Sequence, residues 1–127
     1  MQIVITDGYT LNPGDLSWDP FNSIAEVKYY DRTASYEVAE RCREATIIIT
    51  NKTPITSETI QAALNLKLIA VTATGYNIVD IDAAKQKGIR VCKTFATVIA
   101  AAKPTINKAM NVQAFLRRAR LQSAARR

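Results

Sequence analysis

Residues 67–92 constrain the fold of this chain more than any other stretch. Residues 67–72 form a short, mostly apolar run, which is typical of a strand buried on both faces of a sheet. Asp80 is well suited to the N-cap of a helix, and Gly88 would end that helix as a left-handed cap. Residues 89–92 then predict the next strand. The stretch therefore predicts a strand–loop–helix–strand unit of a parallel sheet.

The loop at 73–77 joins the first strand of this unit to its helix. Ligands of open α/β sheets bind beyond the carboxyl ends of the strands, and backbone N–H groups near a helix N-terminus can hold an anion there. Gly75 allows the sharp backbone path of such a loop. Most loops of this kind bind nothing, so the residues alone favour a tight turn over an anion site.

The same alternation of strand and helix runs through residues 1–66. Strand signals occur at residues 3–5, 26–30 and 46–50, with helix signals between them. The β-branched run at 46–50 should lie in the middle of the sheet, and the more polar run at 26–30 near an edge. Alternation with short loops predicts an α/β fold: a parallel sheet of about five strands with helices on both faces.

Several residues have local roles in this plan. We expect Thr6–Gly8 to form a turn, Ser17 to cap a short helix with Trp18, Phe21 and Ile24, and Ser35 or Thr33 to open a helix through Glu44. Thr56 should cap the next helix, with Ile55 and Ile60 as a hydrophobic staple. Cys42 falls on an apolar helix face as a small hydrophobe.

Charge divides the 127-residue chain into two parts. Residues 1–92 hold 9 Lys and Arg against 11 Asp and Glu, whereas residues 93–127 hold 8 against none. We expect a folded domain at 1–92 and a basic tail at 93–127. An apolar stripe in the tail would suit an amphipathic helix that binds membranes or nucleic acid, but the narrow stripe favours a frayed or disordered tail, with nucleic acid limited to nonspecific contacts. The absence of a signal sequence and of membrane-length apolar runs predicts a cytoplasmic protein without membrane contact.

Several kinds of chemistry are excluded by residue type. The chain has no histidine, so it has no His base and no His metal ligand. Its two cysteines, Cys42 and Cys92, are too far apart in sequence for a zinc motif, so we expect no metal. The four glycines cannot form G-x-G-x-x-G or a P-loop, so no cofactor-binding residue is predicted.

Four strings give the body of the chain a family resemblance. They are TDGYTLNPGDLSWDP, TNKTPIT, ATGYNIVD and AAKQKGI, and they occur in the order found in the N-terminal part of D-2-hydroxyacid dehydrogenases. The chain resembles the glycerate dehydrogenase, or hydroxypyruvate reductase, branch in particular. The resemblance covers residues 1 to about 92.

The resemblance implies a flavodoxin-like substrate-binding domain and an oxidoreductase that reduces hydroxypyruvate or glyoxylate with NADH or NADPH, as a homodimer. It places the main-chain N–H groups of Thr74 and Gly75 on the substrate carboxylate, with Asn51 and Lys52 lining the same cleft. The family's cofactor site and its catalytic Arg, Glu and His belong to a Rossmann domain, so no catalytic residue is assigned to this chain.

The resemblance stops after Cys92, where every acidic residue also disappears. A shifted reading frame would give this pattern, and a diverged linker helix is the alternative. We therefore expect a substrate-binding half truncated before the cofactor domain, which alone binds no cofactor and is inactive. The other hypothesis is a non-catalytic flavodoxin-like module that binds a small anion or a partner protein.

Overall fold

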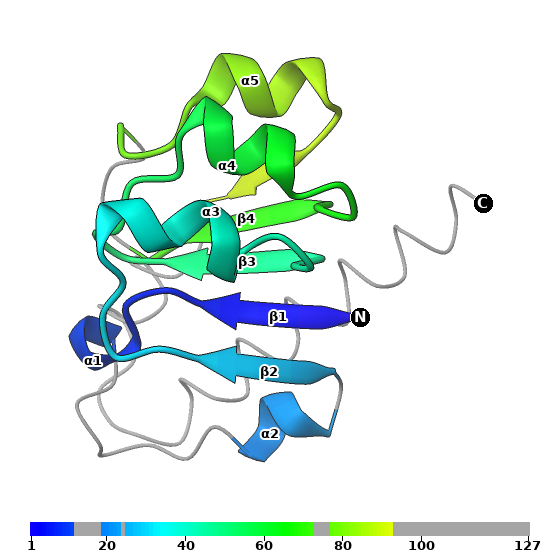
Figure 1. The fold of residues 1–127 in the computed structure, drawn as a ribbon. Helices are drawn as coiled ribbons and strands as arrows, with labels where there is room; N and C mark the ends of the chain where they lie inside the picture. The colour runs from blue at the N-terminus through cyan, green and yellow to red at the C-terminus, as the bar shows by residue number, and fades with distance from the viewer. Residues whose placement is uncertain (12–18, 24, 73–76, 93–127) are drawn as a thin grey trace.

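A computed structural model of the chain describes residues 1–11, 19–23, 25–72 and 77–92. Its sheet has five parallel strands in the order β2-β1-β3-β4-β5 (Figure 1). The strands are β1 Gln2–Ile5, β2 Glu26–Tyr29, β3 Ile47–Thr50, β4 Leu68–Val71 and β5 Arg90–Cys92. The predicted α/β class, the strand number and the parallel direction are confirmed.

Burial follows the position of each strand in the sheet. All four residues of β3 are buried, as are all four of β4, because both strands have a neighbour on each side and apolar layers on each face. Strand β2 has an alternating, half-exposed pattern and lies at one edge. Both expectations, a central TIIIT strand and an edge strand at 26–30, are confirmed.

Three helices cover one face of the sheet (Figure 1). Their side chains pack with those of the strands into one apolar cluster that includes Cys42, Ile48, Ile60, Ile69 and Ala84. The helices are α3 Val38–Arg41, α4 Ser57–Ala62 and α5 Ile81–Gln86. Cys42 is fully buried in this cluster, as the sequence predicted, and burial raises the pKa of its thiol from 9.0 to about 12.

The opposite face carries a second apolar cluster. It contains alternate residues of the inner strands, such as Ile3, Ile47 and Leu68, together with Phe21. Phe21 comes from α2 Asp19–Asn22, which lies beside β2 in Figure 1. Among the described elements α2 is the one that contributes to this cluster from outside the sheet, and it gives the sheet helical cover on both faces.

The helix ends show which caps are made. Asp80 accepts a hydrogen bond from the Ala83 N–H at 2.9 Å, and Gly88 has the left-handed φ of 69°. Both predicted caps are confirmed. Thr56 occupies the N-cap of α4 with extended backbone, but its side chain makes no capping hydrogen bond, so that part of its predicted role is wrong. Ile55 and Ile60 of the predicted staple are both buried in the same cluster.

Other expectations need correction or fall outside the described residues. Residues 6–8 are not merely a turn, because Gly8 begins a short helix, α1 Gly8–Leu11. The long helix expected at 33–44 is shorter, and consists of a 3-10 turn, η1 Ser35–Glu37, followed by α3. Ser17, Trp18, Ile24 and the tail lie outside the described residues. In the part that the structure describes, no helix is both long enough and apolar enough to cross a membrane.

Candidate functional site at the carboxyl ends of the strands

The strand order places a switch point between β1 and β3. From β1 the chain moves outward to β2 in one direction, then returns to β3 and continues in the other direction through β4 and β5. In open parallel sheets, ligands bind at such a switch point, outside the carboxyl ends of the strands. All five strands point to one edge, where the loops after β1 and β3 meet (Figure 1).

Asp7, which follows β1, connects these two loops. Its Oδ1 accepts a hydrogen bond from the Asn51 N–H at 2.9 Å, and its Oδ2 accepts from the N–H groups of Lys52 at 2.5 Å and Thr53 at 3.3 Å. The hydroxyl of Thr6 also donates to Oδ1, at 2.9 Å. Asp7 is 5% exposed, so a buried carboxylate holds the start of the loop after β3.

The two cleft residues predicted on this loop are both found beside Asp7. The side-chain amide of Asn51 donates to the hydroxyl of Thr10 in α1, at 2.9 Å, and Thr10 in turn donates to the Asp7 carbonyl at 2.8 Å. Lys52 is exposed. Among the described residues its ammonium group has neither an ion-pair nor a hydrogen-bond partner, so it is available to an anion at the switch point.

A second connection links the loop after β3 to the segment after β4. Ile55 forms a parallel bridge with Val79: the Ile55 N–H donates to the Ile78 carbonyl at 2.8 Å, and the Asp80 N–H donates to the Ile55 carbonyl at 3.0 Å. The segment that follows residues 73–76 therefore lies beside the loop of Lys52. Thr74 and Gly75, the other two predicted site residues, lie outside the described residues.

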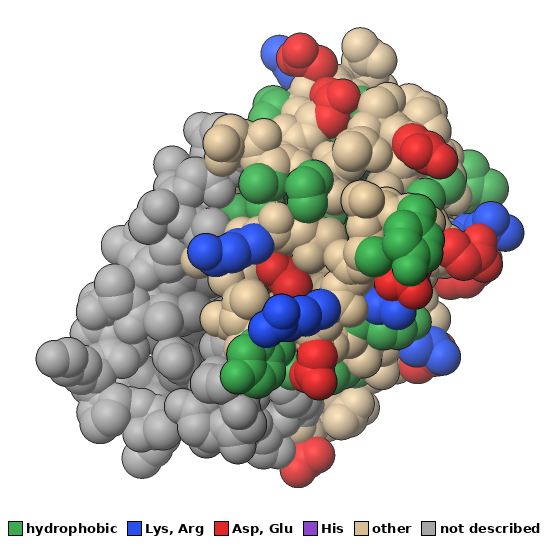
Figure 2. Space-filling model, turned by 60° about the vertical axis from the view of Figure 1, so that its left-hand side comes forward, with side chains coloured by type: hydrophobic (Ala, Val, Ile, Leu, Met, Phe, Trp, Pro, Cys, Tyr) green, Lys and Arg blue, Asp and Glu red, His purple; other side chains and the backbone are tan. Residues whose placement is uncertain are grey.

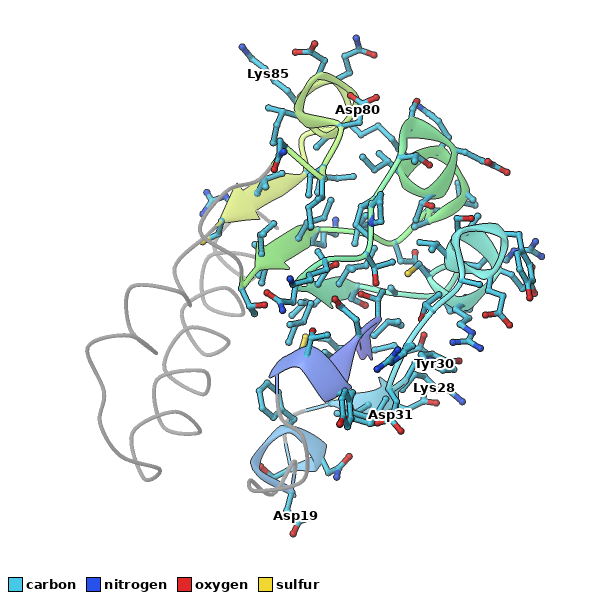
Figure 3. All side chains as sticks on the ribbon, turned by 90° about the vertical axis from the view of Figure 1, so that its left-hand side faces the viewer. Asp19, Lys28, Tyr30, Asp31, Asp80 and Lys85 are labelled. Atoms are coloured by element: carbon cyan, nitrogen blue, oxygen red, sulfur yellow. The ribbon has the colours of Figure 1, made fainter. Side chains whose placement is uncertain are left out.

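Further polar groups surround this edge at the β2 side. The Arg32 guanidinium lies 5.3 Å from the centre of the Tyr9 ring, and the Arg41 guanidinium lies 4.1 Å from the Tyr30 ring. Figure 3 looks onto this edge and shows Tyr30 and Asp31 near β2, far from Asp80 at the N-cap of α5. Figure 2, turned toward the same side, shows Lys and Arg side chains near its middle with acidic groups close by.

The described residues do not fit a nicotinamide dinucleotide or a metal. A Cβ on Gly8 would lie 2.1 Å from the Tyr29 ring, so Gly8 serves packing, and Gly88 ends α5; neither forms a pyrophosphate cradle. Within the described ranges no group of three or more metal-binding side chains occurs. Among the described groups at this edge, the exposed ammonium of Lys52 is the one that carries a positive charge on the loop after β3.

Sequence reasoning missed Asp7. By residue type Asp7 is predicted to be a turn residue, because an aspartate after a strand is common in turns. The available signal was its place directly after a buried strand, at the edge where ligands bind in α/β folds. What the sequence lacked was the strand order, which brings this carboxylate against the loop after β3.

Two curated relatives match the chain over part of their length. A hydroxypyruvate reductase of Blautia hydrogenotrophica is 47% identical over 94 residues, which are 72% of this chain and 29% of the relative. A glycerate dehydrogenase of Methylorubrum extorquens is 44% identical over 72 residues, 56% of this chain and 23% of the relative. The chain thus spans less than a third of the length of either protein.

Solved structures and a family model agree with these relatives. An acyclic imino acid reductase in complex with NADPH and D-Arg superposes with a TM-score of 0.57 at 25% identity, covering 72% of this chain and 30% of that one. The model of the family described as D-isomer specific 2-hydroxyacid dehydrogenase, catalytic domain, matches residues 3–106, and so continues past Cys92. This chain belongs to the D-isomer specific 2-hydroxyacid dehydrogenase family, and it is similar to members named glycerate dehydrogenase and hydroxypyruvate reductase.

Proposed function

We propose that this chain forms the substrate-binding side of the cleft of a 2-hydroxyacid dehydrogenase that reduces hydroxypyruvate or glyoxylate. Lys52 would attract the substrate carboxylate, Asn51 would line the cleft beside it, and the main-chain N–H groups of Thr74 and Gly75 would bind the carboxylate. The single observation that carries the proposal is the exposed ammonium group of Lys52 at the switch point between β1 and β3.

The geometry supports a ligand that is small and anionic. The buried carboxylate of Asp7 fixes the backbone at Lys52, while the Lys52 side chain stays in solvent. A positive charge held in place loses less freedom when it binds a carboxylate than a charge on a mobile loop does. The names of the two relatives support hydroxypyruvate as the first substrate to test.

Hydride transfer would need groups beyond the described residues. The donor would be NADH or NADPH, as the NADPH complex of the imino acid reductase supports, and it would bind elsewhere than to the described residues. The folded substrate-binding unit would correspond to residues 1–92. The enzyme would act as a homodimer. The 127-residue chain by itself would show no turnover, because it has neither a histidine nor a dinucleotide motif.

The test is a titration of isotopically labelled protein with hydroxypyruvate, followed by backbone amide shifts. We expect shifts at residues 51–53 and at Asn77, with a dissociation constant of about 1 mM or weaker, since about 4 kcal/mol or less is available from one side of a cleft. Hydroxyacetone, which has the same hydroxyketone without the carboxylate, should give no comparable response.

Variants make the test specific to one side chain. Lys52→Met should weaken hydroxypyruvate binding roughly tenfold, because a charge-assisted contact is lost. Lys67→Met is the matched control: Lys67 is also exposed, but it precedes β4 and so lies at the opposite edge of the sheet. Equal effects of the two variants, or an equal response to hydroxyacetone, would refute the proposed role.

A further inference from the structure

Three consecutive backbone N–H groups, those of Asn51, Lys52 and Thr53, converge on the Asp7 carboxylate. Successive N–H groups that point to one place form a typical anion-binding concavity. Here the anion is part of the chain itself. In the described residues Asp7 has no cationic partner, so these N–H groups and the hydroxyls of Thr6 and Thr10 are what satisfy the buried carboxylate.

This arrangement limits how the loop can meet a ligand. Because its N–H groups donate to Asp7, they are not available to a substrate carboxylate. The side-chain amide of Asn51 is also engaged, since it donates to Thr10. Lys52 is the remaining donor of residues 51–53 that is exposed and without a described partner. Its Cα position is set by the 2.5 Å bond from its own N–H to Asp7 Oδ2.

We propose that Asp7 is a positioning residue, which orders the loop at 51–53 and through it orients Lys52 toward the ligand. This inference rests on the proposed function for its ligand but makes a separate claim about the loop. An asparagine at position 7 would have nearly the same size, yet it cannot replace the carboxylate. Whichever way its amide is turned, its NH₂ group faces backbone N–H donors, at Asn51 on one side or at Lys52 and Thr53 on the other.

The first experiment measures amide hydrogen exchange in the full chain without ligand. Asp7→Asn should speed amide exchange at Lys52 and Thr53 by tenfold or more. The ratio of the exchange rates of the β3 amides to those of the β4 amides should stay as in the wild type. Asp82→Asn is the matched control, because it makes the same chemical change on the exposed side of α5. Unchanged exchange at residues 51–53 in Asp7→Asn would overturn the inference.

The second experiment measures binding of hydroxypyruvate in a double-mutant cycle. Asp7→Asn should weaken binding about tenfold in the wild-type background and have no further effect in Lys52→Met, since Asp7 acts through Lys52. Independent, additive losses would overturn the inference. A merely structural Asp7 would weaken both backgrounds equally.

The two readouts separate failure of the inference from failure of the proposed function. If wild-type protein binds no hydroxypyruvate, the proposed function fails, and exchange at residues 51–53 still decides whether Asp7 orders the loop. Should Asp7→Asn not fold, Asp7→Glu keeps the charge but adds a methylene at a 5%-exposed site, and faster exchange at 51–53 is expected there too.

Discussion

Replacing Gly8 with alanine tests how closely α1 packs on the edge of the sheet. An ideal Cβ at this position would lie 2.1 Å from Cε2, 2.6 Å from Cζ and 2.8 Å from Oη of Tyr29. Carbon atoms in contact are normally about 3.5–4.0 Å apart, so the ring must move. The backbone cannot yield instead without disturbing the bond from the Gly8 N–H to the Tyr30 carbonyl, at 2.9 Å.

The expected loss follows from two opposed effects. Moving the Tyr29 ring out of the apolar cluster on its face of the sheet should cost roughly 2–3 kcal/mol, within the range for overpacked sites. Replacing a glycine in a helix returns at most about 1 kcal/mol. The net destabilisation is therefore about 1–3 kcal/mol, which lowers the midpoint of thermal unfolding by roughly 4–24 °C in a domain of this size.

Urea unfolding followed by far-ultraviolet circular dichroism measures this loss. The control is Gly8→Ala in a Tyr29→Ala background, where the ring is absent and the same alanine should be neutral or slightly stabilising. A Gly8→Ala protein as stable as the wild type would refute the reasoning. So would an equal loss in both backgrounds.

Two further predictions concern caps and titration. Asp80→Ala should reduce the free energy of unfolding by about 1 kcal/mol, whereas Thr56→Ala should reduce it by less than about 0.5 kcal/mol. The reason is that Asp80 makes a capping hydrogen bond and Thr56 does not. Equal losses in urea titrations of the two variants would contradict this. Since burial raises the pKa of Cys42 from 9.0 to about 12, the folded protein keeps a proton that the unfolded chain releases above pH 9. The free energy of unfolding should therefore fall as pH rises above about 9, by up to about 1.4 kcal/mol per pH unit. Cys42→Ala should lack that part of the decline when its free energy of unfolding and that of the wild type are compared at pH 8 and 10.

The sequence predicted the elements of the fold better than their lengths. A run such as TIIIT is apolar on both faces wherever it lies, so its central place follows from its composition. The helix expected at 33–44 is shorter because residues 35–37 adopt a 3-10 turn and α3 ends at Arg41. The Glu37 carboxylate accepts a hydrogen bond from the Ala34 N–H as in a capping box, so the element begins at an alanine rather than at Ser35 or Thr33. An apolar periodicity does not locate such ends.

The candidate site could be predicted only in part. Asn51 and Lys52 came from the family resemblance, and the structure places them at the switch point. Asp7 lies 44 residues away from Asn51 in sequence, and only pairing of β1 with β3 brings the two together. Thr56 and Asp80 both suit an N-cap by residue type, yet only Asp80 makes the capping hydrogen bond, so residue type alone does not predict which cap forms.

The bridge between Ile55 and Val79 has a consequence for engineering the substrate range of this family. Two backbone hydrogen bonds, at 2.8 and 3.0 Å, join the chain that leaves β3 to the chain that enters α5. A graft of residues 51–55 from another family member would therefore place the new segment against residues 77–80 of this chain, with which it did not evolve to pair. Exchange of residues 51–55 together with residues 77–80 keeps both halves matched, so loop libraries for this edge of the sheet should vary the two segments as a single cassette.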